Sequence, residues 1–118
     1  MAIINGVLTH IGNHIKAGIK YELGQIMLPD GDYIINASIS AKAKNKSGVS
    51  GLSIHFVDRD SDIILSGSSA SDDISVSSTN LTCLVSGPKP VSMYILSGSD
   101  VTISLHQFVA CKINNNEE

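Results

Sequence analysis

The sequence predicts an all-β fold, an antiparallel β-sandwich of jelly-roll type, and three observations support this prediction. Apolar and polar residues alternate with a period of two, β-branched residues and Ser are abundant, and turn residues separate the alternating runs. A helix would instead require a period of about 3.6 residues. Seven to nine short antiparallel strands with no helix between them are expected to form two packed sheets.

The clearest strand covers residues 33–43. Its two parities differ in character, since one is apolar and the other is mostly polar: Tyr33, Ile35, Ala37, Ile39, Ala41 and Ala43 against Ile34, Asn36, Ser38, Ser40, Lys42 and Lys44. This pattern is typical of a strand with one packed face and one face toward water. The other expected strands are shorter: 52–57, 63–65, 74–76, 81–85, 91–96 and 101–106.

Turn residues delimit these runs. Pro29-Asp30-Gly31, 45–48, 59–62 and 97–100 are predicted turns, because they combine Pro, Gly, Asn, Asp and Ser. Gly87-Pro88-Lys89-Pro90 is predicted to be a rigid connection through which no strand pairing continues. In the first 25 residues, Ile11, Ile15 and Ile19 recur every four positions, as in a helix. Interspersed glycines weaken that interpretation, so strands or irregular structure are expected there.

Length and composition indicate one domain, residues 1–113, followed by a flexible tail, 114–118. The chain has 118 residues, of which 42% are hydrophobic and 16% charged, which excludes a disordered chain. No apolar run approaches the roughly 20 residues of a membrane-spanning helix. No signal peptide is visible at the amino terminus, so a virion or cytoplasmic location is expected.

The charge balance argues against a nucleic-acid partner. Eight basic residues, of which Arg59 is the only arginine, face eleven acidic ones, and the basic cluster Lys42, Lys44 and Lys46 fits a solvated strand face. Cys83 and Cys111 each lie in an apolar run. They favour two free, buried thiols, with a disulfide between them as the alternative.

Two segments resemble the jelly roll of the tumour necrosis factor and complement globular-head superfamily. Leu28–Ile39 is similar to that family's Pro-x-Gly-x-Tyr turn and the long strand after it, and Leu96–Leu105 resembles its late Gly-Asp turn before a Val-x-Leu strand. The resemblance covers about residues 26–113. It departs from the family where Ser99 separates Gly98 from Asp100, and at the carboxyl end, which lacks the aromatic-glycine-aromatic finish.

The resemblance implies a homotrimer in which one sheet of each subunit faces a threefold axis. Several strands also carry apolar residues on both parities, which a sheet wetted on one side does not need. Burial against another subunit explains this pattern, and cover by the chain's own loops is the alternative. The predicted interface residues are Ile34, Ile64, Tyr94 and Leu96.

The polar clusters favour structural explanations over chemistry. Asp58, Asp60 and Asp62 alternate as calcium ligands do, but the glycine and glutamate of an EF-hand loop are missing, so an acidic turn is favoured over a calcium site. His10 and His14 would share one helix face as zinc ligands, without a third ligand nearby. His55 and His106 lie on polar parities and are expected to meet water, with mutual contact or a trimer axis as alternatives.

No catalytic motif is present. The sequence lacks a Gly-x-Ser-x-Gly nucleophile elbow and a phosphate-binding loop, and the apolar neighbours of both cysteines offer no group that would activate a thiolate. The expected function is therefore a non-enzymatic structural or adhesive module without cofactor, a trimeric virion or phage decoration or fibre-head protein. Its expected partners are copies of itself and capsid or tail proteins. The alternative is a carbohydrate-binding module that recognises surface glycans, which the absence of Trp disfavours.

Overall fold

In the computed structural model, every regular element among the described residues, 3–9, 13–43, 51–70 and 76–113, is a β-strand. Eight strands follow one another: β1 (Ile3–Asn5), β2 (Val7–Leu8), β3 (His14–Ile15), β4 (Tyr21–Ala43), β5 (Leu52–Asp58), β6 (Ile63–Ala70), β7 (Val76–Leu96) and β8 (Val101–Lys112). All of their pairings are antiparallel. The predicted all-β class is confirmed.

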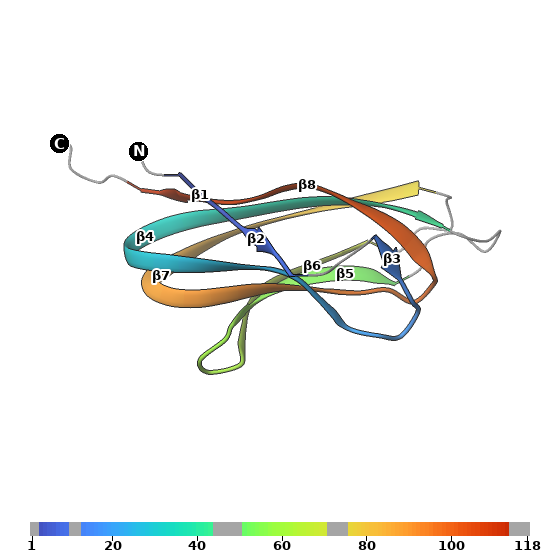
Figure 1. Ribbon diagram of the computed structural model, residues 1–118, viewed down its shortest axis with the longest axis horizontal. Coiled ribbons are helices and arrows are strands. Elements are labelled where there is room, and N and C mark those ends of the chain that lie inside the picture. The colour runs from blue at the N-terminus through green and yellow to red at the C-terminus, as the bar shows by residue number, and fades with distance from the viewer. Residues whose placement is uncertain (1–2, 10–12, 44–50, 71–75, 114–118) are drawn as a thin grey trace.

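The two long strands, β4 and β7, bend together and so produce both layers of the molecule. They span 23 and 21 residues and pair with each other on both sides of a register shift between Leu28 and Gly31. Figure 1 shows both strands turning back at the same end of the molecule, so that each has one half in an upper layer and one half in a lower layer. One long paired ribbon thus supplies the centre of both sheets.

Divided at this bend, the main strand order gives four strands in each layer, and the short strands β3 and β2 are added beside β8 in the first layer and beside β4 in the second. The first layer has the order β1-β8-β4-β7 and uses residues 31–43 of β4 and 76–87 of β7. The second layer has the order β4-β7-β5-β6 and uses residues 21–28 and 89–96. The pairs are nested, with the β5–β6 hairpin innermost and β1–β8 outermost, which is the winding of a jelly roll. The predicted antiparallel β-sandwich of jelly-roll type is therefore confirmed.

The core lies between the two layers and follows the alternation read in the sequence. The apolar parity of residues 33–41 is buried, whereas the intervening side chains are exposed or half-buried. The largest fully buried side chains come from both layers: Tyr33, Phe56, Ile15, Leu28, Ile35, Ile39, Leu52, Ile54, Met93, Ile95 and Val91.

The prediction that no strand pairing continues through Gly87–Pro90 is wrong. β7 is continuous there, and Lys89 and Pro90 are register partners of Leu28 and Met27. Likewise, Pro29-Asp30-Gly31 is a bend within β4 and not a turn between two elements. The two proline segments lie opposite each other, and the register shift accommodates the one extra residue of β4. The backbones approach so closely that a Cβ atom on Gly87 would overlap the carbonyl oxygen of Pro29.

The turns at 59–62 and 97–100 are confirmed as the connections after β5 and β7. The predicted turn at 45–48, most of the predicted strand at 74–76, and the tail at 114–118 lie outside the described residues. The first 25 residues are strands and irregular structure where the structure describes them, as expected.

This amino-terminal segment crosses from one layer to the other over the ring of Phe108. β1 pairs with β8 in the first layer, whereas β2 pairs with Gly24 and Gln25 of β4 in the second. Between them, the amide of Gly6 donates to the carbonyl of Phe108 at 2.8 Å. A Cβ atom on Gly6 would overlap the Phe108 ring, and one on Gly24 would lie 2.9 Å from its Cε2. Two glycines therefore make room for one buried aromatic ring.

Candidate interaction surfaces

The four predicted interface residues lie on opposite sides of the sandwich. Ile34 is on the outer face of the first layer and is 42% exposed. Ile64 is 64% exposed on the outer face of the second layer, where the half-buried Tyr94 and Leu96 also lie. A contact made by one sheet alone cannot use all four residues. The reason is topological, because the bend places residues 31–43 and 89–96 in different layers.

On the first-layer outer face, four side chains form what we call the apolar row, Ile3, Cys111, Ile34 and Leu84. They are successive register partners across β1, β8, β4 and β7. Ile3 and Leu84 are 64% and 68% exposed, and Cys111 is half-buried. Of this row, the sequence predicted only Ile34 as an interface residue. The other three residues are aligned with Ile34 by strand register, which the sequence does not show.

Beside the apolar row, the same face carries amides and hydroxyls. The Asn36 side-chain amide donates to Thr82 Oγ1 at 2.6 Å and to Asn80 Oδ1 at 3.2 Å. Further along, Ser40 Oγ and His106 Nε2 lie 2.7 Å apart. A catalytic Ser–His pair needs a third group that orients the imidazole, and no carboxylate among the described residues hydrogen-bonds this ring. The Ser40–His106 pair therefore has the character of a surface hydrogen bond between strands.

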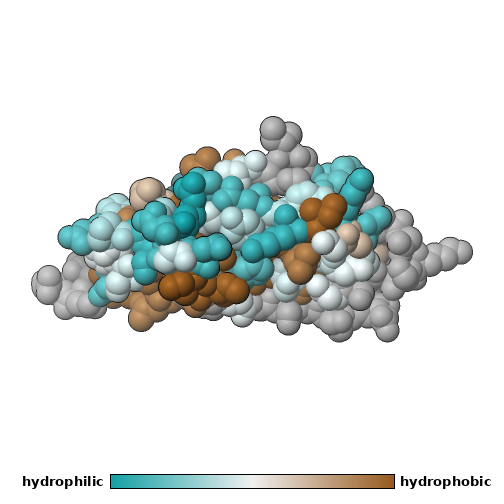
Figure 2. Space-filling view, turned by 90° about the horizontal axis from the view of Figure 1, so that it is seen from below, coloured by the Kyte–Doolittle hydropathy of each residue, from teal (hydrophilic) through white to brown (hydrophobic). Residues whose placement is uncertain are grey.

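The second-layer outer face is more highly charged. Ser92 Oγ donates to Glu22 Oε2 at 2.7 Å, and the Gln25 amide donates to both oxygens of the same carboxylate at 3.1 and 3.2 Å. Arg59 Nη1 in turn donates to Gln25 Oε1 at 3.0 Å, which links the loop after β5 to β4. Figure 2, seen from the side on which the β5–β6 hairpin protrudes, shows apolar patches among hydrophilic side chains.

The hydrogen bonds of Glu22 determine its protonation. Burial alone would raise the pKa of this carboxyl, but hydrogen bonds from Ser92, Gln25 and Thr9, together with the charge of Arg59, outweigh burial and lower the pKa below its ordinary value of 4.5. A carboxylate with this many donors stabilises the contact between β4 and β7.

We expect Glu22 to contribute to the acid sensitivity of the fold. Because its pKa is lowered in the folded state, its stabilising contribution is complete above pH 4.5 and is lost as the pH falls through the folded-state value. Urea unfolding of wild type and Glu22→Gln, at neutral pH and near pH 3, measures this effect. The wild-type free energy of unfolding should fall more than that of the variant, and equal losses in both proteins would contradict the assignment.

His55 and Tyr94 are neighbours on the same face, with ring centroids 6.0 Å apart, and Lys20 Nζ lies 4.4 Å from the Tyr94 ring centroid. Burial, followed by the charge of Lys20, lowers the pKa of His55. His55 and His106 are in different layers, so the alternative that they face each other is wrong. His14, in β3, is exposed, and His10 lies outside the described residues.

Few aromatic rings of this protein are open enough to pack against a sugar. All five rings of the chain lie in the described part, and Tyr33, Phe56 and Phe108 are buried. Tyr21 is half-buried, and Lys20 and His55 lie against the ring of Tyr94. Sugar CH faces pack on open aromatic rings, so these positions add no support to the carbohydrate-binding alternative, which stays a prediction.

Asp58, Asp60 and Asp62 belong to the β5–β6 hairpin. The amide of Asp60 donates to Asp58 Oδ1 at 3.0 Å, and Asp58 Oδ2 lies 3.8 Å from Lys89 Nζ. Asp62 has a positive φ of 58°, and its amide donates to the Asp58 carbonyl at 2.7 Å. These contacts are those of an acidic turn. Across the described ranges, no three His, Cys, Asp or Glu side chains are grouped as metal ligands would be.

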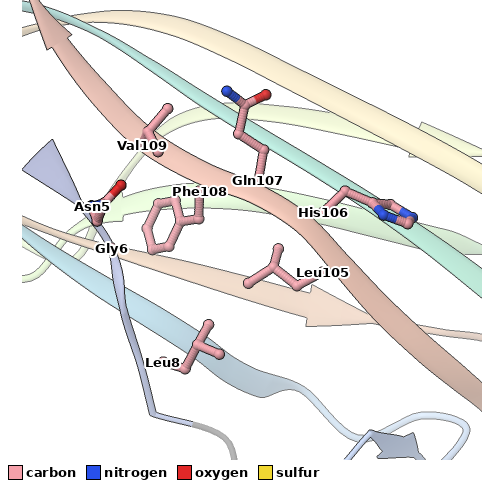
Figure 3. Close-up of a pocket in the computed structure, with 8 residues that line it drawn as sticks. All are labelled: Asn5, Gly6, Leu8, Leu105, His106, Gln107, Phe108 and Val109. Carbon is pink, nitrogen blue, oxygen red and sulfur yellow. The ribbon is translucent and has the colours of Figure 1, made fainter. Parts of the chain in front are cut away.

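A hollow of about 270 Å³ lies where β1 and the segment after it cross β8. Its lining is Asn5, Gly6, Leu8, Leu105, His106, Gln107, Phe108 and Val109. Figure 3 shows the ring of Phe108 directed toward Gly6, with Gln107 and Val109 on the other side of β8. The lining contains one titratable side chain, His106, and no carboxylate, Lys, Arg, Ser or Cys.

Cys83 and Cys111 are half-buried, and neither forms a disulfide. They lie on opposite faces of the first layer, because Cys83 pairs with the buried Ile35 whereas Cys111 pairs with the exposed Ile34. The alternative of a disulfide between them is therefore wrong. The described part of the chain contains no helix with the length and apolarity needed to cross a membrane.

Comparison with known proteins supports the fold and nothing more specific. No family model matches the chain, and no curated protein matches it. Membership of the tumour necrosis factor and complement-head superfamily thus stays a prediction. Among six matching chains of solved structures is one from the crystal structure of the infectious bursal disease virus VP2 subviral particle. The TM-score is 0.58 at 7% sequence identity, and the match covers 97% of this chain and 34% of that one. This chain therefore corresponds to about a third of the viral chain and shares its β-sandwich fold.

Proposed function

We propose that this protein is a non-enzymatic structural module of a virion, and that it assembles with copies of itself. The observation that carries the proposal is the exposed apolar row on the first layer, because contiguous apolar patches on a protein surface mark interaction sites when they extend over several hundred Å² with the side chains around them. The likeness to a viral particle protein supports the virion setting at the level of fold.

The finer form of the proposal is a homotrimeric decoration or fibre-head protein, as on a phage. The trimer rests on the resemblance of residues 26–113 to the tumour necrosis factor and complement-head jelly roll, and on the apolar residues of both sheet faces. Capsid or tail proteins are its proposed further partners. Catalysis is not part of the proposed role, since His106 is the only acid–base group that lines the hollow beside β8, and no carboxylate among the described residues orients its imidazole in the Ser40–His106 pair.

Native mass spectrometry and light scattering test self-assembly directly. We expect a stable trimer at micromolar concentration. A monomer under these conditions would overturn the proposal, and a dimer would overturn the trimer while leaving self-assembly in place. Glycan-array screening with and without calcium separates the proposal from the carbohydrate-binding alternative, which predicts saccharide binding by the isolated protein.

A further inference from the structure

We propose that the outer face of the first layer, centred on the apolar row Ile3, Cys111, Ile34 and Leu84, is the surface through which neighbouring copies of this chain contact each other in the assembly. This inference rests on the proposed self-assembly and specifies which of the two sheet faces performs it. The opposite face, which carries Ile64, Tyr94 and Leu96, is then exposed to solvent or to other partners.

The first argument is continuity. The four apolar side chains are aligned by register across every strand of the layer, with no polar side chain between them. In the next row on the face, the half-buried Val109 is the one apolar residue, and its row neighbours are Asn5, Asn36 and Thr82. The apolar surface is thus a band across the sheet and not a set of scattered residues.

The second argument is charge. Between Asp32 and Lys42 on β4, the outward positions Ile34, Asn36, Ser38 and Ser40 carry no formal charge. Their outward partners on β7 and β8 in the described part of the chain are amides, hydroxyls and apolar groups, with His106 at the margin. A second copy can cover this area without burying an unpaired charge, which would otherwise be costly. The opposite face would require desolvation of Glu22, Arg59 and Lys20.

The third argument is area. The strands lie about 4.8 Å apart, four of them beside Ile34–Asn36 and three beside Ser40, and the seven residues from Ile34 to Ser40 take about 3.3 Å each. Together they define a surface of roughly 500 Å² once side-chain margins are included. Two copies would bury about 1,000 Å² in total, which reaches the lower limit for a specific interface. The apolar row alone is too small for this, so the amide and hydroxyl rows must take part.

The test compares two isoleucines on opposite faces, Ile34→Glu and Ile64→Glu, by native mass spectrometry and sedimentation. We expect Ile34→Glu to raise the dissociation constant of the assembly by about tenfold or more, because a carboxylate would be buried without a partner. Ile64→Glu should leave it unchanged. Leu84→Glu is a second variant of the same face, and circular dichroism with urea unfolding confirms that each variant is folded.

The thiol of Cys111 provides an independent readout. In a Cys83→Ser background, maleimide labelling of Cys111 should be slow in the assembled protein and fast after Ile34→Glu separates the copies, with urea-unfolded protein as the reference for full labelling. Fast labelling of Cys111 in an intact assembly would contradict the proposed contact.

The outcomes separate the two proposals. If the wild type assembles and Ile34→Glu and Leu84→Glu do not weaken it, the contact is elsewhere and this inference is overturned, while self-assembly stands. Dissociation by Ile64→Glu alone would assign the contact to the second layer. A monomeric wild type would overturn the proposed self-assembly itself.

Discussion

Gly87→Ala is expected to lower the free energy of unfolding by about 3 kcal/mol or more, one of the largest effects of any single methyl group in this chain. The added Cβ would overlap the carbonyl oxygen of Pro29 and lie 3.2 Å from that of Leu28. Both are backbone atoms of the paired strand at the bend, so no side chain can rotate away. This overlap can be relieved only if the β4 and β7 backbones move apart at the bend between the two layers.

Urea unfolding followed by circular dichroism measures this effect through the midpoint and slope of the transition. Gly67→Ala is the matched control, because a Cβ there would meet its nearest atom, His55 Cβ, at an ordinary 3.5 Å. We expect the control to change stability by less than about 1 kcal/mol. A Gly87→Ala protein as stable as the control would show that the bend tolerates a wider separation of its strands.

Phe108→Ala is expected to cost about 3–5 kcal/mol, the range for removing a buried aromatic side chain. The ring is 5% exposed, its centroid lies 6.0 Å from that of Phe56, and Gly6 and Gly24 bound it. Its removal leaves a cavity beneath the segment that crosses between the layers. Differential scanning calorimetry or urea unfolding gives the loss directly.

A double-mutant cycle makes this prediction specific to packing. Gly6→Ala should destabilise the wild type, because its methyl group overlaps the Phe108 ring, but should be neutral or stabilising in the Phe108→Ala background, where the methyl group enters the vacated space. A coupling of at least about 1 kcal/mol is expected between the two positions. If the effects of the two substitutions are additive, Gly6 is required for its backbone conformation and not to make room for the Phe108 ring.

The sequence predicted what depends on local alternation. The apolar parity of residues 33–41 became the buried face, and the turns at 59–62 and 97–100 are present. It failed at Gly87–Pro90, where the usual effect of proline is to end a strand. There β4 bends at the same level as β7, and a register shift accommodates the unequal numbers of residues in the two strands. The paired residues are more than 55 positions apart in the sequence, so no local pattern predicts this pairing.

The candidate surfaces were predicted less completely than the fold. Ile34 and Ile64 are both predicted interface residues because apolar residues occupy both parities of their strands, and both are exposed. Their separation onto opposite faces was not visible, because parity says which side of its own strand a residue occupies and not which layer the strand joins. Ile3 and Leu84 were missed for the related reason that strand register, not spacing along the chain, aligns them with Ile34.

Alternation and turn chemistry by themselves determined that this protein is an antiparallel sandwich with a continuous core, because each strand buries one face whatever its partner. Only the tertiary structure decided that two long strands bend to serve both layers, that Phe108 fills the space between Gly6 and Gly24, and that four distant apolar residues form one row. These features depend on pairing between segments that are far apart in the sequence. The residues that stabilise this pairing come into contact only when the chain has folded, so no local pattern reveals them.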